Sequence, residues 1–492
     1  MGRGPNKLGL LARAGIAFAA VTVVVVAIAR YPGTQIDFCF FLAAFVLLVA
    51  STAPRPRMYG YTFFAAFLFL GFAVKAVAYF ALGVTLLEPT GNFNGTASAW
   101  DASLLPATVG ALGCVAIRTL HLLARKRFGS LQPHDPPEWY QTARRWLLPS
   151  TAALVILLNL ANLAAAFYEI GLRPRLILPA HLNAVIAWLL STGAALWIAT
   201  MVGWDLRKGR PAGSLSVALL EALASSSTLS RASYLFRLVS YVGPSIESRD
   251  RFVAAFSRRV RLAFAVAGIV GFALSLSIVS ALRTVTYPSA SNETTRPTQP
   301  PLLTLPGLGS RTVPLDPKLL EKVPAIVGEL KGMLVGRWIG IEGTMTVASY
   351  PQLGGSLFRE SLLEDPSAGE SSLYQRMAGS FYQTDAAFNF GTTPGVIAVF
   401  YYSGSSVMVF IGLGFITAVL ILVELAANRL VRNPFVVSAT GLALANAASQ
   451  LNFPYLFIVF LFELSATLLL LGLLTHGFQR SRTATARVTI QA

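Results

Sequence analysis

Long apolar segments alternate with short polar segments along most of the chain. A helix rises about 1.5 Å per residue, so about 20 apolar residues cross the hydrocarbon core of a bilayer, which is roughly 30 Å thick. A bilayer offers the backbone no hydrogen-bond partners, whereas a helix satisfies its own N–H and C=O groups, so we predict an all-α polytopic membrane protein with about ten transmembrane helices. The predicted spans are Leu10–Ala29, Ile36–Thr52, Tyr61–Leu87, Leu104–Leu123, Trp146–Tyr168, Leu182–Trp204, Leu262–Ala281, Val396–Val423, Pro434–Leu451 and Pro454–Thr475.

Composition agrees with this prediction, because 54% of the 492 residues are hydrophobic and only 12% are charged, which is too apolar for one soluble core. The net charge is +17. Lys and Arg lie mainly in the loops on one side of the alternation, which predicts cytoplasmic N- and C-termini. No basic and aromatic module of the kind that binds nucleic acid is visible. The first apolar segment resembles a cleavable signal, but its length favours a retained anchor.

The charge pattern divides the chain into four parts. A membrane bundle of seven helices covers residues 1–281, a large extracytoplasmic loop covers 282–395, three further membrane helices cover 396–476, and a cytoplasmic tail covers 477–492. The extracytoplasmic loop is far longer than a connection requires, and we expect it to be mostly helical and irregular and to cap a cavity. The basic cytoplasmic loop 205–261 is predicted either to lie along the inner membrane surface or to be a solvated helical linker. Its leucines at helical spacing are Leu219, Leu223, Leu235 and Leu238.

Lys75 lies near the middle of the third predicted span, and Glu463 lies inside the tenth. Ionisable groups within a bilayer are costly and are usually paired or face a cavity. Both residues lie at a similar depth below the outer boundary, so we predict that Lys75 and Glu463 form an intramembrane pair that closes the bundle.

The large extracytoplasmic loop contains the run from Gly336 to Met345, which includes Arg337 and Glu342. Gly340 permits a turn that would let the two side chains converge. A guanidinium suits phosphate oxygens, and a carboxylate can accept a proton. The residues alone leave a second interpretation open, in which Arg337 and Glu342 form an ordinary surface ion pair. No DxD motif, P-loop, HExxH or Cys/His cluster is present, so no metal and no cofactor is predicted.

The Arg-Trp-Ile-Gly-Ile-Glu-Gly-Thr-Met run is followed by Thr393-Pro394-Gly395 and then by Tyr401-Tyr402-Ser403-Gly404-Ser405. Over roughly the last third of the chain, this arrangement resembles the bacterial Wzy-type oligosaccharide repeat-unit polymerases of O-antigen and exopolysaccharide synthesis. The related O-antigen ligases are associated with a histidine in the large outer loop. All four histidines of this chain lie outside that loop, which favours a polymerase over a ligase.

The resemblance implies a membrane glycosyltransferase at the periplasmic face of the bacterial inner membrane. Such proteins join repeat units carried on undecaprenyl diphosphate, in contact with membrane lipids and in some cases with a chain-length regulator as partner. Carried over to this chain, Arg337 would hold the diphosphate and Glu342 would be the base or would orient the acceptor. Further candidates for substrate binding are Arg359, Arg376, Asp385, Arg173, Arg175 and His181.

Five of these six further candidates also have a plain structural interpretation. The three residues of the large loop would be solvated, and Arg173 and Arg175 would anchor at lipid headgroups. Two other function classes stay open as well. A transporter or flippase for a lipid-linked glycan or small substrate would use charges within the spans, and a non-catalytic scaffold of an envelope assembly would use the outer loop.

Overall fold

The computed structural model describes residues 7–86, 88–124, 135–170, 176, 178–179, 182–230, 232–247, 254–286, 338–364, 372–379 and 393–489. Every element in these ranges is a helix. Seven helical stretches among them are long and apolar enough to cross a membrane, and three shorter apolar helices accompany them. The structure therefore confirms an all-helical protein of the multi-pass membrane type, while the count of ten spans and their orientation stay predictions.

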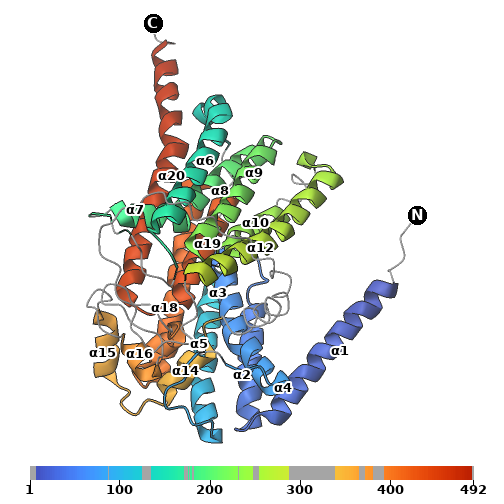
Figure 1. Ribbon diagram of the computed structural model, residues 1–492, viewed down its shortest axis with the longest axis vertical. Helices are drawn as coiled ribbons and strands as arrows, with labels where there is room; N and C mark the ends of the chain where they lie inside the picture. The colour runs from blue at the N-terminus through green and yellow to red at the C-terminus, as the bar shows by residue number, and fades with distance from the viewer. Residues whose placement is uncertain are drawn as a thin grey trace.

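The elements that precede the large loop are arranged as an elongated bundle from which α1 diverges (Figure 1). They are α1 (Lys7–Arg30), α2 (Gln35–Ala50), α3 (Tyr59–Phe69), η1 (Leu70–Val74), α4 (Lys75–Leu82), α5 (Ala97–Ala124), α6 (Glu138–Ala165), α7 (Leu182–Trp188), η3 (Leu189–Gly193), α8 (Ala194–Arg207), α9 (Ala212–Ala224), η4 (Ser225–Thr228), α10 (Ser233–Glu247) and α12 (Arg258–Thr286). The later elements are α14 (Ile341–Ala348), α15 (Gly355–Leu363), α16 (Leu373–Ala378), α17 (Val396–Tyr401), α18 (Ser406–Val431), α19 (Pro434–Ser449) and α20 (Pro454–Thr489).

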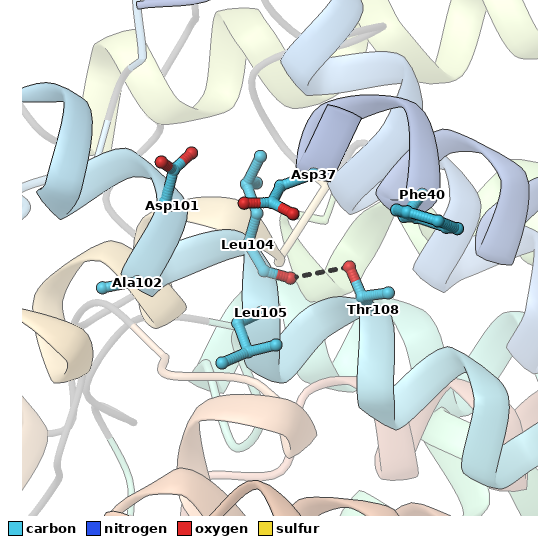
Figure 2. Close-up of a pocket in the computed structure, with 7 residues that line it drawn as sticks. All are labelled: Asp37, Phe40, Asp101, Ala102, Leu104, Leu105 and Thr108. Carbon is cyan, nitrogen blue, oxygen red and sulfur yellow. Dashed lines mark hydrogen bonds between the residues drawn. The ribbon is translucent and has the colours of Figure 1, made fainter. Parts of the chain in front are cut away.

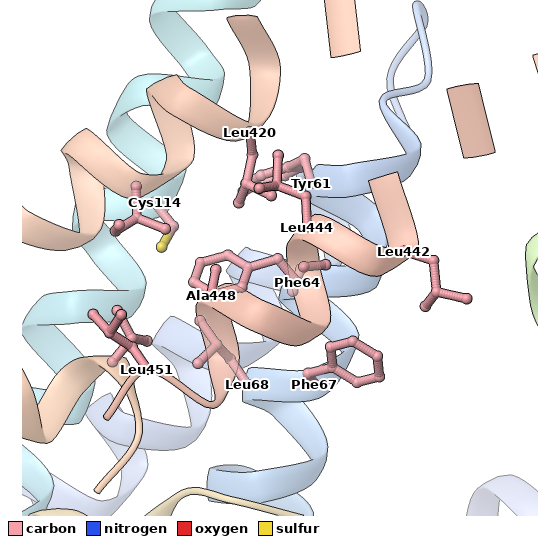
Figure 3. Packing of buried hydrophobic residues seen from close by; sticks show 14 of the residues in the cluster. Tyr61, Phe64, Phe67, Leu68, Cys114, Leu420, Leu442, Leu444, Ala448 and Leu451 are labelled. Atoms are coloured by element: carbon pink, nitrogen blue, oxygen red, sulfur yellow. The ribbon is translucent and has the colours of Figure 1, made fainter. Parts of the chain in front are cut away.

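The core lies where α3 packs against α19 and where α5 packs against α18. Figure 3 shows Phe64 and Leu68 of α3 close to Leu444 and Ala448 of α19. Small residues allow this close packing, because a Cβ at Gly441 would overlap the backbone of Gly60, as is common where membrane helices cross.

A carboxylate fixes the start of α3 in this core. The Glu424 side chain on α18 accepts the backbone N–H groups of Tyr59 and Gly60, both at 2.7 Å. These N–H groups have no partner within the helix, so Glu424 acts as a cap supplied from a distant part of the chain.

Two of the long apolar stretches contain a π-helical turn. The turn η1 separates α3 from α4, and η3 separates α7 from α8. A π turn inserts one residue into a helix, shifts the faces that follow and frees backbone carbonyls, and such turns are frequent at functional sites. Both turns lie beside buried charges, as described below.

The predicted eighth span, Val396–Val423, corresponds to the apolar helix α18 at Ser406–Val431, but its predicted start is wrong. The chain forms the short helix α17, turns at Tyr402–Ser405, and begins α18 at Ser406. Gly404 has a φ of 68°, a conformation that glycine adopts readily, and the Ser405 hydroxyl accepts the N–H of Met408 to cap α18. A continuous apolar run therefore hides a helix break, which two small polar residues and a glycine make possible.

The sequence predicts that the loop 205–261 lies along the inner membrane surface or forms a solvated linker. The structure shows neither arrangement. The helices α9 and α10 of this loop form a hairpin that packs against α6, α8, α12 and α19. At its tip, the Thr228 carbonyl accepts the N–H of Ile170, just beyond the C-terminal end of α6. At its other end, Glu247 accepts a hydrogen bond from Tyr59 at the start of α3. The hairpin therefore extends along most of the length of the bundle.

Candidate functional site

Three residues in a line along the stretch from α3 to α4 contact residues 338–342, which belong to the run on which the family resemblance is based. Phe67, Gly71 and Lys75 follow one another at intervals of one helical turn. The Phe67 ring stacks on Trp338 with 5.8 Å between ring centroids. The next turn, at Gly71, meets the backbone of Ile339 and Gly340. Part of the predicted outer loop therefore lies inside the helical bundle.

Lys75 forms the central contact of this line of residues. Its Nζ lies 2.7 Å and 2.8 Å from the two carboxylate oxygens of Glu342, and it also donates to the Trp338 carbonyl at 2.7 Å. The two side chains are 2% and 3% exposed. Because breaking a buried ion pair leaves an uncompensated charge that costs about 3–5 kcal/mol, this pair holds the inserted segment firmly.

The predicted pairing of Lys75 with Glu463 is therefore wrong. Glu463 lies half-buried on α20 and forms no ion pair with the residues that the structure describes. Depth along a helix can be estimated from sequence, but the direction in which each side chain points cannot. The insertion of a loop segment that supplies a nearer carboxylate could not be foreseen either.

Glycines allow the inserted segment to approach so closely. A Cβ at Gly340 would overlap the Gly71 backbone, and a Cβ at Gly343 would overlap the carbonyl of Pro394. These contacts explain why the run alternates glycines with larger residues, since no other residue type fits against a neighbouring backbone at this distance.

The helix α14 is buried from Ile341 to Val347 and packs mainly against α5 and α17. The hydroxyl of Thr346 lies 3.4 Å from that of Tyr374 on α16. Burial is the largest cause that raises the pKa of the Tyr374 phenol well above its ordinary value. Tyr374 is thus a neutral hydrogen-bonding group that joins α14 to α16.

The other predicted site residues do not gather around this pair. Arg359 is exposed on α15, and Arg376 is exposed on α16, where it forms a 3.0 Å ion pair with Glu360. Arg337 lies outside the described residues and directly precedes Trp338, the first residue of the inserted segment. Four more predicted residues also lie outside the described residues: Asp385, Arg173, Arg175 and His181.

A second buried ion pair was missed from the sequence. In the α9–α10 hairpin, the Arg237 Nε lies 3.0 Å from a Glu221 carboxylate oxygen. Arg237 also donates to the carbonyl of Leu190, in the π turn η3, at 2.6 Å. The hairpin belongs to a segment that looks like a basic cytoplasmic loop, so its charges were expected to be solvated. The one available signal was the large apolar fraction of α9.

An aromatic contact connects the two ion pairs. Phe67, which stacks on Trp338, also contacts Phe236 with 5.6 Å between ring centroids. Phe236 directly precedes Arg237, and Trp338 directly follows Arg337. Phe236, Phe67 and Trp338 thus form an aromatic row that joins the α9–α10 hairpin to the inserted segment.

A separate pocket of about 450 Å³ lies between α2 and α5 (Figure 2). Its two carboxylates are those of Asp37 and Asp101. Asp101 accepts hydrogen bonds from the Tyr31 hydroxyl at 2.7 Å and the Thr34 N–H at 3.0 Å. Asp101 therefore holds the turn between α1 and α2, and this pocket is not part of the Lys75–Glu342 site.

No known protein family, curated protein or solved structure matches this chain. The chemistry of the site must therefore be judged from its geometry. Both Glu342 oxygens bind one ammonium group, so Glu342 is not free to take a proton from a substrate in this state. The arrangement can instead position the backbone of residues 338–342, directly beside Arg337, against the bundle.

Proposed function

We propose that the chain is a polymerase that joins undecaprenyl-diphosphate-linked oligosaccharide units into O-antigen or exopolysaccharide. The observation that carries this proposal is the buried anchor formed by Lys75, Glu342 and the Trp338 carbonyl. It fixes Trp338, the residue next to Arg337, within the helical bundle. The proposed location is the periplasmic face of a bacterial inner membrane, with a chain-length regulator as a possible protein partner.

In the proposed reaction, an acceptor hydroxyl of one lipid-linked unit attacks the anomeric carbon of the other. The bond between that carbon and the diphosphate oxygen breaks, and the hydroxyl proton passes to a base. Arg337 neutralises the negative charge that develops on the leaving diphosphate. Preorganised cations stabilise such charge in the transition state. We now assign Glu342 a positioning role with Lys75 rather than the role of base, because its oxygens are already occupied.

The experiment that tests this proposal is a gel of lipid-linked glycans from a deletion strain that carries variant genes. Arg337→Ala is expected to abolish long chains and leave single lipid-linked units, and Arg337→Lys to restore some of them. The matched control is Arg258→Ala, which removes an exposed arginine from α12. Long chains of normal amount in the Arg337→Ala strain would refute the proposal.

The alternative class is a transporter or flippase for a lipid-linked glycan or a small substrate. Two interrupted helices, each beside a buried charge, favour it, because transporters use broken helices and buried charges near the membrane centre. The deletion strain separates the two functions. Loss of a polymerase leaves single units on the outer face of the membrane, whereas loss of a flippase retains them on the cytoplasmic face.

A further inference from the structure

Arg237 has the features of a residue that binds an anion. It is not part of the Lys75–Glu342 ion pair. Its guanidinium is held on one edge by Glu221 at 3.0 Å and on another by the Leu190 carbonyl at 2.6 Å. Its third nitrogen, Nη1, makes no hydrogen bond to the residues that the structure describes. The side chain is 10% exposed, and its two contacts fix the plane of the guanidinium.

The two buried cations of the site differ in this respect. Within the described part of the chain, the hydrogen bonds of the Lys75 ammonium go to Glu342 and the Trp338 carbonyl, and the side chain is buried. An arginine, by contrast, has five donors in a rigid fork and can bind a carboxylate with one edge and a phosphate with another. Glu221 therefore orients Arg237 without using all of its hydrogen-bonding capacity.

Arg237 also lies near the segment that follows Arg337. Successive ring contacts of 5.6 Å and 5.8 Å connect Phe236 to Phe67 and Phe67 to Trp338. Phe67 is 9% exposed, and the two outer rings are partly exposed. The aromatic row supplies an apolar surface beside the α10 residue that precedes Arg237, against which a polyprenyl chain could pack.

A transfer between two lipid-linked units brings together two diphosphates, one on the donor and one on the acceptor. Two dianionic or trianionic groups repel each other strongly at short range in a medium of low dielectric constant. Each therefore requires its own cation, and one arginine cannot serve both.

We propose that Arg237 binds the diphosphate of a second polyprenyl-diphosphate-linked substrate, in addition to the one bound by Arg337. The inference rests on the proposed function for the need for two substrates. The site itself is defined by the free edge of Arg237, with Glu221 and the Leu190 carbonyl as its positioning partners.

The test is the number of undecaprenyl diphosphate molecules bound per chain, measured by native mass spectrometry on the purified full-length protein. We expect two for the wild type, one for Arg237→Gln, one for Arg337→Ala and none for the double variant. Removal of a charged hydrogen-bonding partner is expected to weaken the affected site by at least about tenfold. Arg237→Lys retains the charge, and is expected to bind two molecules with the second one weakened.

Arg144→Gln is the matched control. Arg144 forms a comparable pair with buried Asp205, at 2.7 Å and 2.8 Å. Asp205 lies about 20 Å from Leu190 along the α7–α8 stretch, at about 1.5 Å per residue. The Arg144→Gln variant is expected to bind two molecules. Two molecules bound at wild-type affinity to Arg237→Gln would overturn the inference, as would an equal loss in Arg144→Gln. If the wild type binds two molecules, one through each arginine, but forms no polymer from lipid-linked units, the proposed function fails and the second site stands.

Discussion

Two segments that resemble loops in the sequence are inserted into the bundle, and they are anchored in opposite ways. In the first, the cation belongs to the membrane helix, and the inserted segment supplies both the Glu342 carboxylate and the Trp338 carbonyl. In the second, the inserted α10 carries the cation, and the π turn of the membrane helix supplies the Leu190 carbonyl.

The difference has a functional consequence. A compact ammonium surrounded by three oxygens has no donor left for a ligand, whereas an arginine held at two edges does. The Lys75–Glu342 pair is therefore suited to hold a segment in place, and the Arg237–Glu221 pair is suited to bind an anion. The variants below test this contrast, from the largest expected effect to the smallest.

Lys75→Ala is expected to cause the largest loss. It leaves Glu342 buried without a counter-charge, at a cost of about 3–5 kcal/mol in the free energy of unfolding. Unfolding of the purified protein in detergent measures this loss, and the glycan gel should show no long chains. The exchanged pair Lys75→Glu with Glu342→Lys should recover part of both. Wild-type stability of Lys75→Ala would show that the pair does not anchor the segment.

Gly343→Ala tests whether close backbone packing, and not charge alone, holds the first segment. The added Cβ would overlap the Pro394 carbonyl, and overpacking of this kind costs about 1–3 kcal/mol. We expect a lower unfolding temperature and shorter glycan chains. Gly355→Ala is the control, because nothing lies within 4 Å of a Cβ at that position. Equal effects of the two substitutions would contradict the packing argument.

Phe67→Leu sharpens the comparison, because Phe67 contacts both inserted segments. Aromatic pairs contribute about 0.5–1.5 kcal/mol beyond the area they bury, so we expect a modest loss of stability. In a double-mutant cycle, Phe67→Leu and Phe236→Leu should show a coupling of about 0.5 kcal/mol or more. Purely additive effects would mean that the aromatic row does not join the two segments.

Arg376→Gln is expected to have the smallest effect on stability. Its ion pair with Glu360 is about half exposed on both sides, and exposed pairs contribute roughly 0–1 kcal/mol. The unfolding temperature should stay within error of the wild type. A loss comparable to that of Lys75→Ala would show that α16 is anchored through this pair and not through its buried face.

The sequence by itself determined the membrane class, the helical fold and the approximate position of most apolar helices. These features follow from the length and composition of local segments, which suffice to decide whether a segment can cross a bilayer. It also singled out the run from Arg337 to Met345 and the buried charge at Lys75, because glycines beside charged residues and an ion within a span are locally unusual.

Only the tertiary structure decided which of these groups meet. The partner of Lys75 is Glu342, 267 positions away, and not Glu463, because a segment of the predicted outer loop enters the bundle where the glycines leave space for it. The hairpin of α9 and α10 was missed for the same reason. Its serines and charges look like those of a loop, and their hydrogen bonds inside the bundle come from residues distant in the chain, such as Asn162 and Ser275. Local patterns report what a segment can bury, whereas the identity of its partners depends on contacts between segments far apart in sequence.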